Sequence, residues 1–167
     1  MSRVTVGLVV VFAVGNAWAQ AVPCALLTAS DISAVGAAGS GSSSSMPFAD
    51  GTASGGTMNL CQWSMATGGL MLSVAKTPAS LSREAVMTAL NQSWGELKTK
   101  GWKEEKQQFG AVSCFLMTPP AGDKNAPKPT SCTVFNKGMV LSITAMGTTR
   151  VEMEKVKALL DSAVGRL

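Results

Sequence analysis

Four cysteines and a complete lack of histidine define the chemistry that this sequence can carry. The cysteines are Cys24, Cys61, Cys114 and Cys132, and no two of them form a C-x-x-C pair. This spacing and the absence of histidine disfavour a zinc site. The Ser-His-Asp and Cys-His nucleophile arrangements also require histidine. We therefore expect two structural disulfides, with no metal ion and no cofactor.

The pairing of four cysteines has three possible forms. We favour Cys24–Cys61 and Cys114–Cys132, because the second pair would join two adjacent strands that flank one loop. The sequence leaves the other two pairings open. Each bridge should stabilise the fold by about 2–4 kcal/mol by restricting the unfolded chain.

The first nineteen residues have the three parts of a secretory signal peptide. Arg3 is followed by the apolar run 4–14, and Ala17-Trp18-Ala19 is a small-x-small cleavage site. The run is too short to span a bilayer, so we expect no transmembrane segment. We predict cleavage after Ala19 and an exported protein, either periplasmic or secreted.

The mature chain, 20–167, has the length of a single domain. Its first cysteine, Cys24, follows Pro23 rather than the cleavage site, so acylation of a lipoprotein type is disfavoured. The full chain carries a net charge of +4, and its lysines between 98 and 106 alternate with glutamates. Such a mild, interleaved charge is typical of a solvated face, so no nucleic-acid partner is expected.

Hydrophobic spacing and turn residues predict three helices and at least six strands. Helices are expected over 26–36, with Thr28 as N-cap and Asp31 three residues on, over 82–100, and from about 150, where Thr149 and Glu152 would form a capping box. Strands are expected over 58–66, 70–76, 102–109, 111–117, 131–136 and 139–146. Thr67-Gly68-Gly69 and Asn136-Lys137-Gly138 would close hairpins.

These elements indicate an α+β domain with a mostly antiparallel sheet of about six strands flanked by three helices. Two segments fall outside this pattern. Residues 37–57 are rich in Gly and Ser, which favours a flexible connection or a poorly ordered hairpin, within which Met46-Pro47-Phe48 could form a short strand. Residues 118–130 contain four prolines and are expected to form an exposed loop.

A family resemblance accompanies this pattern. Pro23-Cys24-x-Leu26-Leu27-Thr28-x-x-Asp31-Ile32, then Gly36 and Cys61-x-Trp63, resembles small exported cell-envelope proteins and lipoproteins of unknown function. The resemblance implies a PsbP-like α/β/α sandwich and assigns no catalytic residue. This chain lacks their acylated cysteine at the cleavage site, so a lipid anchor is not implied.

Other reactive patterns have structural explanations. Glu104 and Glu105 would point to opposite faces of a strand, and so would Ser73 and Lys76 of an S-x-x-K match. The ten methionines could bind Cu(I), but most fall in predicted strands, which favours core packing.

We therefore expect a non-enzymatic binding module with a protein partner in the cell envelope or outside the cell. An inhibitor or immunity-type protein fits this class. Its binding residues are expected in the proline-rich loop, where exposed residues sit on a rigid frame: Pro119, Pro120, Asp123, Lys124, Asn125 and Lys128. One alternative is a carrier of a small apolar ligand lined by Trp63, Trp94 and Trp102. A second is an unrecognised hydrolase.

Overall fold

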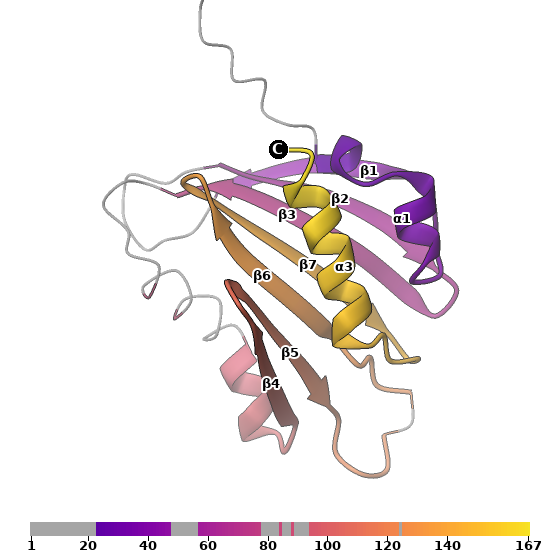
Figure 1. Ribbon diagram of the computed structural model, residues 1–167. Helices are drawn as coiled ribbons and strands as arrows, with labels where there is room; N and C mark the ends of the chain where they lie inside the picture. The colour runs from indigo at the N-terminus through magenta and orange to yellow at the C-terminus, as the bar shows by residue number, and fades with distance from the viewer. Residues whose placement is uncertain (1–22, 48–56, 78–83, 85–87, 89–93, 124) are drawn as a thin grey trace, which may run out of the picture.

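A computed structural model describes residues 23–47, 57–77, 84, 88, 94–123 and 125–167 of the chain (Figure 1). The expected signal peptide, 1–19, and residues 82–83, 85–87 and 89–93 of the expected helix 82–100 lie outside the described residues. In the part that is described, no helix has the length and apolar character needed to cross a membrane.

One antiparallel sheet of seven strands organises the molecule, with the order β1-β2-β3-β7-β6-β5-β4. The α+β class is as expected, and the sheet has one strand more than predicted. The PsbP-like resemblance stays a prediction. The strands are β1 (Ala37–Pro47), β2 (Thr57–Met65), β3 (Gly68–Lys76), β4 (Lys103–Phe109), β5 (Val112–Thr118), β6 (Thr130–Asn136) and β7 (Met139–Gly147).

The additional strand, β1, corrects the expectation of a flexible connection over 37–57. Its residues pair with β2 from Ala37 to Pro47, with a register shift between Ala38 and Ser42. At the shift, Gly41 adopts a positive φ of 75°. A Cβ on Gly41 would lie 2.6 Å from the Cys61 Sγ, so only glycine fits there. Residues 48–56 lie outside the described part of the chain.

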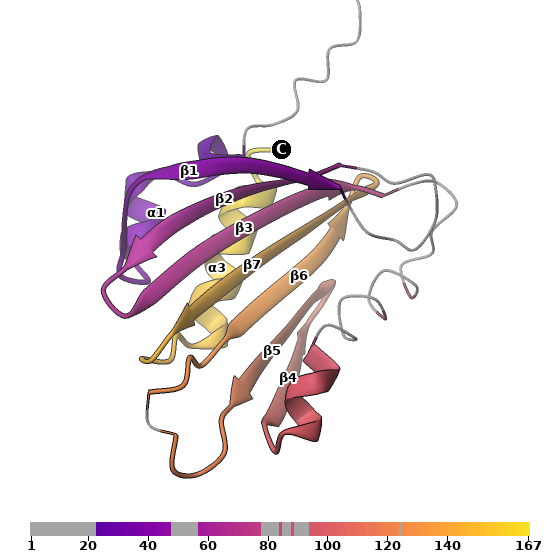
Figure 2. The ribbon, with the colours of Figure 1, turned by 180° about the vertical axis from the view of Figure 1, so that it is seen from behind.

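One face of the sheet carries the 3₁₀ helix η1 (Pro23–Leu26), α1 (Ala29–Ser33) and α3 (Met153–Val164) (Figures 1 and 2). As the alternation of Leu70, Leu72 and Val74 predicts, these side chains point to this face and are buried. They pack in one core with the buried stripe of α3, which consists of Met153, Val156, Leu159, Leu160 and Ala163. Removing this apolar surface from water is the main driving force of the fold.

The opposite face is polar at its centre. The Ser131 Oγ lies 2.9 Å from the Thr144 Oγ1, and the Thr133 hydroxyl donates to the Ser142 Oγ at 2.9 Å. These hydroxyl groups therefore find partners on neighbouring strands. The helical residues 94–99 cover this face near β4 and β5 (Figure 2), where Trp94 packs edge-on against Phe115.

The helix ends follow their sequence signals in two of three cases. Thr28 is the N-cap of α1, as predicted, and it also forms a capping box with Asp31. The helical residues 94–99 stop where Gly101 was expected to end them. Gly101 has a φ of 81°, and the Trp102 N–H donates to the Leu97 carbonyl at 3.1 Å. This bond closes a Schellman motif.

The third helix start differs from the prediction. The capping box of Thr149 and Glu152 is wrong, because α3 begins at Met153 with Glu152 as its N-cap and no side-chain capping bond. Hydrogen bonds to neighbouring elements hold the preceding residues in a non-helical link. The Thr148 N–H donates to the Thr67 carbonyl at 3.1 Å, and the Thr130 hydroxyl donates to the Val151 carbonyl at 2.6 Å.

The hairpins are tighter than the sequence indicated. Met65 pairs with Gly68, so the β2–β3 turn is Ala66-Thr67, and the two glycines belong to β3. The reason is a close approach to β7, since a Cβ on Gly68 would lie 1.9 Å from the Met146 carbonyl oxygen. The β6–β7 hairpin has Lys137 and Gly138 at positive φ, as a type I′ turn requires.

Both predicted disulfides are present. Cys24–Cys61 ties η1 to β2, and Cys114–Cys132 joins the adjacent strands β5 and β6 at directly opposed positions. Trp63, two residues after Cys61, is buried on the same face of the sheet.

Candidate functional site

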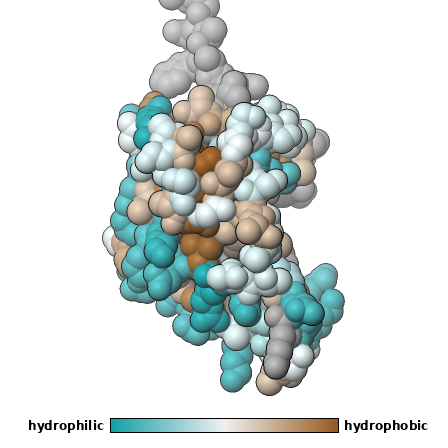
Figure 3. Space-filling view, turned by 90° about the vertical axis from the view of Figure 1, so that its right-hand side faces the viewer, coloured by the Kyte–Doolittle hydropathy of each residue, from teal (hydrophilic) through white to brown (hydrophobic). Residues whose placement is uncertain are grey.

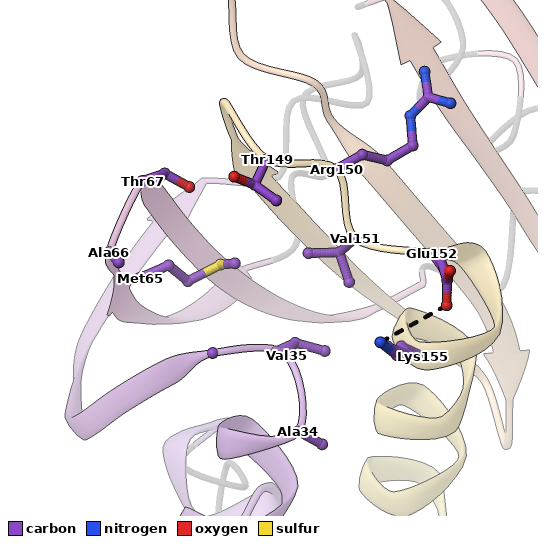
Figure 4. Close-up of a pocket in the computed structure, with 11 residues that line it drawn as sticks. Ala34, Val35, Met65, Ala66, Thr67, Thr149, Arg150, Val151, Glu152 and Lys155 are labelled. Atoms are coloured by element: carbon purple, nitrogen blue, oxygen red, sulfur yellow. Dashed lines mark ion pairs between the residues drawn. The ribbon is translucent and has the colours of Figure 1, made fainter.

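A pocket of about 330 Å³ lies at one end of the sheet (Figure 4). Three connections form it: the link from α1 to β1, the β2–β3 turn, and the link from β7 to α3. Its lining residues are Ala34, Val35, Gly36, Met65, Ala66, Thr67, Thr149, Arg150, Val151, Glu152 and Lys155. Segments that are far apart in the sequence therefore meet at this pocket.

The link from α1 to β1 forms one wall of the pocket, and a turn at Gly36 sets its course. After α1 ends, Gly36 adopts a φ of 76° and turns the chain into β1. A residue with a Cβ rarely adopts this conformation. The turn leaves the Val35 side chain buried beside the pocket, next to exposed Ala34.

The opposite wall, residues 148–152, is fastened on several sides. The Gly147 carbonyl accepts a hydrogen bond from the Lys128 N–H at 2.7 Å, and Thr148 is bound to the β2–β3 turn. Arg150 donates from Nη2 to the Thr118 Oγ1 at 2.6 Å. These bonds, with that of Thr130 to Val151, hold the wall against β5, β6 and their loop.

The pocket has an apolar interior and a charged rim. Val35, Met65 and Val151 supply its hydrophobic surface, and Glu152 and Lys155 stand at its edge as an ion pair with an Oε2–Nζ distance of 3.7 Å (Figure 4). Their side chains are 69% and 58% exposed, so solvent screens the pair and it contributes little stability. Both charges therefore remain available to a ligand.

In the view that faces the α1 side of the molecule, a narrow band of hydrophobic atoms lies among near-neutral side chains, with hydrophilic ones farther out (Figure 3). Arg150 points away from the pocket toward the strand end that holds its partner Thr118 (Figure 4). This arginine thus links the pocket wall to the base of the proline-rich loop.

The residues predicted to bind a partner lie at the same end of the sheet, in the loop between β5 and β6. Pro120, Asp123 and Asn125 are exposed, and Pro119 and Lys128 are half-buried. Lys124 lies outside the described residues.

The base of this loop is packed rather than free. Ala126 is buried, Pro129 is fully buried, and the Pro129 carbonyl accepts from the Met117 N–H at 2.9 Å. With the Cys114–Cys132 bridge below it, the loop presents exposed residues on a fixed support.

The pocket itself was missed by sequence reasoning. Its lining consists of common residue types scattered over three connections, and no local motif marks them. Thr67, Thr149 and Glu152 carry local signals, but these indicate a turn and a helix start rather than a binding site. The residues become a site only when the strand order brings their connections together.

The possible catalytic patterns keep their structural roles. Glu104 forms ion pairs with Lys98 and Lys106, while Glu105 alternates to the other face of β4. Ser73 donates to the Ser142 carbonyl at 3.3 Å, and Lys76 lies on the opposite face of β3. Within the described ranges, no three His, Cys, Asp or Glu side chains gather where a metal ion could be held.

The tryptophans expected to line a ligand cavity are divided between the two faces of the sheet. Trp63 is buried in the core on the α3 side. Trp94 packs against Phe115 on the other side. These two side chains therefore do not line one cavity.

Comparisons of the chain with protein-family models, with curated proteins and with solved structures found no match.

Proposed function

We propose that this protein is an exported, non-enzymatic binding module that captures a protein partner at the pocket end of its sheet. Export is supported by two disulfides, which persist in oxidising compartments. Cleavage after Ala19 stays a prediction, and the intact mass of the mature protein tests it. An inhibitor or immunity-type role belongs to the same proposal.

The observation that carries the binding proposal is the pocket beside the fastened β7–α3 link. A cavity of about 330 Å³ is at the lower end of the size range of ligand sites. It suits one or two apolar side chains of a partner, while Lys155 and Glu152 at the rim offer a cation and an anion. The exposed tip of the proline-rich loop would extend the contact along the same end.

Pre-organisation favours this interpretation. Binding costs less when the contacting groups are already fixed, and both the pocket wall and the loop base are held by hydrogen bonds and a disulfide. The absence of a recognised general acid, base or nucleophile arrangement among the pocket residues favours binding over catalysis.

Site-specific photo-cross-linking in the exported fraction of the host tests the proposal. A photoreactive residue replaces Ala66, which is exposed at the pocket, and in a control variant it replaces Ala111, which is exposed in the β4–β5 turn. We expect one defined protein adduct at position 66 that excess unlabelled protein removes. Equal adducts at both positions, or none at position 66, would contradict the proposal.

Native mass spectrometry separates this proposal from the carrier alternative. The partly apolar lining of the pocket is the observation that keeps a small ligand as a second candidate. A stoichiometric small-molecule adduct that an Ala66→Trp variant loses would favour the carrier. A bound protein that the same variant loses would favour the interaction module.

A further inference from the structure

The two edge strands of the sheet differ in charge. β1 and β4 are the end members of the strand order. β4 carries four charged residues, Lys103, Glu104, Glu105 and Lys106, whereas β1 has none between Ala37 and Pro47. An unpaired strand edge offers backbone N–H and C=O groups to another chain, and charged side chains are one means by which proteins prevent this.

Only the two ends of β1 carry features that discourage another strand from pairing with it. The register shift between Ala38 and Ser42 bends its first half, and such bulges discourage pairing. Pro47 ends the strand with a residue that lacks an N–H. Between them, residues 42–46 pair regularly with β2 and have exposed side chains. No strand in the described ranges pairs with their outer side.

The exposed stretch ends in a large apolar side chain. Met46 is 44% exposed and lies opposite Met58 of β2. Among the described residues, the only other large hydrophobic side chain with comparable exposure is Met146. A second strand beside β1 would cover part of Met46 and continue the sheet.

We infer that β1 is a self-association surface, on which residues 42–46 of a second copy pair antiparallel about a two-fold axis at Ser44. Ser43 then faces Ser45 of the second copy, and Ser42 faces its Met46. The two seven-stranded sheets become one continuous sheet. A two-fold interface uses the same patch on both copies, so a strand that pairs with itself must carry no opposing like charges.

The two edge strands differ in whether they meet this requirement. If two copies of β4 paired antiparallel about a two-fold axis between Glu104 and Glu105, these two carboxylates would lie opposite each other, and Lys103 would lie opposite Lys106. Like charges directly opposed across a strand pair are destabilising. The β1 edge brings together only serine and methionine side chains, so β1 is the edge that accepts a second copy.

Sedimentation equilibrium of the mature protein tests this inference. We expect a reversible monomer–dimer equilibrium whose dissociation constant rises about tenfold or more in Ser44→Lys, where two ammonium groups would meet at the axis. Gln107→Lys, on the exposed β4 edge, is the matched control and should leave the constant unchanged. Ser44→Thr, a better strand former, should retain the dimer.

Three outcomes would overturn the inference. The first is a wild-type protein that stays monomeric into the millimolar range. The second is a dimer that Ser44→Lys and Gln107→Lys weaken equally, or that neither affects. The third is a monomer that binds an extended peptide from another protein along β1, which would replace the second copy by a foreign strand. Equal unfolding midpoints of the variants confirm that association alone has changed.

Discussion

The Arg166 guanidinium lies 2.8 Å from the Asp31 carboxylate, joining the end of α3 to α1. The same Nη1 donates to the Leu26 carbonyl at 2.8 Å. Asp31 in turn accepts from the Thr28 N–H and hydroxyl, both at 2.7 Å. One arginine therefore fastens η1, the cap of α1 and the C-terminal helix, and this cluster supports the α1 side of the pocket.

A double-mutant cycle on Arg166→Gln and Asp31→Asn should show that the two side chains are coupled. We expect Arg166→Gln to lower the free energy of unfolding by about 1 kcal/mol, because a partly exposed ion pair and the hydrogen bonds to the Leu26 and Ser162 carbonyls are lost. The coupling between the two substitutions should be about 0.5–1 kcal/mol. Urea unfolding with the disulfides intact provides the measurement.

The control for this cycle is Lys157→Gln, which breaks the more exposed pair with Asp161 along α3. Such i,i+4 pairs contribute about 0.2–0.5 kcal/mol. A loss in Lys157→Gln as large as that in Arg166→Gln would show that the α1–α3 contact has no particular importance.

The Asp31 carboxyl should also make stability depend on pH in the acid range. Burial raises the pKa of Asp31, but hydrogen bonds from Thr28 and the hydrogen bond and charge of Arg166 lower it below its ordinary value of 3.8. Because the pKa is lower in the folded state, the stabilisation is complete above the unfolded pKa of about 3.9. It is lost as the pH falls through the folded pKa.

The difference in unfolding free energy between wild type and Asp31→Asn should therefore be constant from neutral pH to about pH 5 and should narrow below about pH 4. Urea unfolding at a series of pH values measures it. In an Arg166→Gln background the narrowing should be smaller and should end at a higher pH, because one cause of the lowered folded pKa is gone. A difference that does not change with pH would contradict this account.

Gly68 and Gly69 offer a matched test of how closely the backbones of β3 and β7 approach each other. Gly68→Ala should lower the free energy of unfolding by about 1–3 kcal/mol, because the new methyl group would meet the backbone of Met146 and Gly147. Gly69→Ala meets only the Trp63 carbonyl oxygen at 3.4 Å and should change stability by no more than about 0.5 kcal/mol. Thermal unfolding of the two variants measures both effects. Equal losses would mean that the strands are not this close.

Removing a disulfide should destabilise the protein by an amount that increases with the number of residues in the loop that the bridge closes. Cys114→Ala with Cys132→Ala opens a sequence separation of 18 residues, for which loop-closure entropy predicts a loss of about 3 kcal/mol. Cys24→Ala with Cys61→Ala opens 37 residues and should cost about 4 kcal/mol. Urea unfolding of the two double variants measures the losses. No loss in either variant would mean that its bridge is not formed in the exported protein.

The sequence by itself determined the elements whose signals are local. The alternation of Leu70, Leu72 and Val74 predicted β3, because side chains of a strand alternate between faces. Thr28 predicted the start of α1, and Lys137 with Gly138 predicted a tight hairpin. The short loop between Cys114 and Cys132 also favoured their pairing. In each case the signal and the structure lie within a few residues or on adjacent strands.

The tertiary structure decided what depends on distant partners. A glycine- and serine-rich segment has weak strand preference, and β1 forms because β2 offers it backbone partners on both sides of the register shift. The capping box at Thr149 was a sound local expectation, but hydrogen bonds from Thr130 and to Thr67 hold residues 148–151 in a non-helical link. The pocket follows from this outcome, because its wall is the link that did not become helix. Propensity acts within a few residues, whereas these bonds join positions that only the strand order brings together.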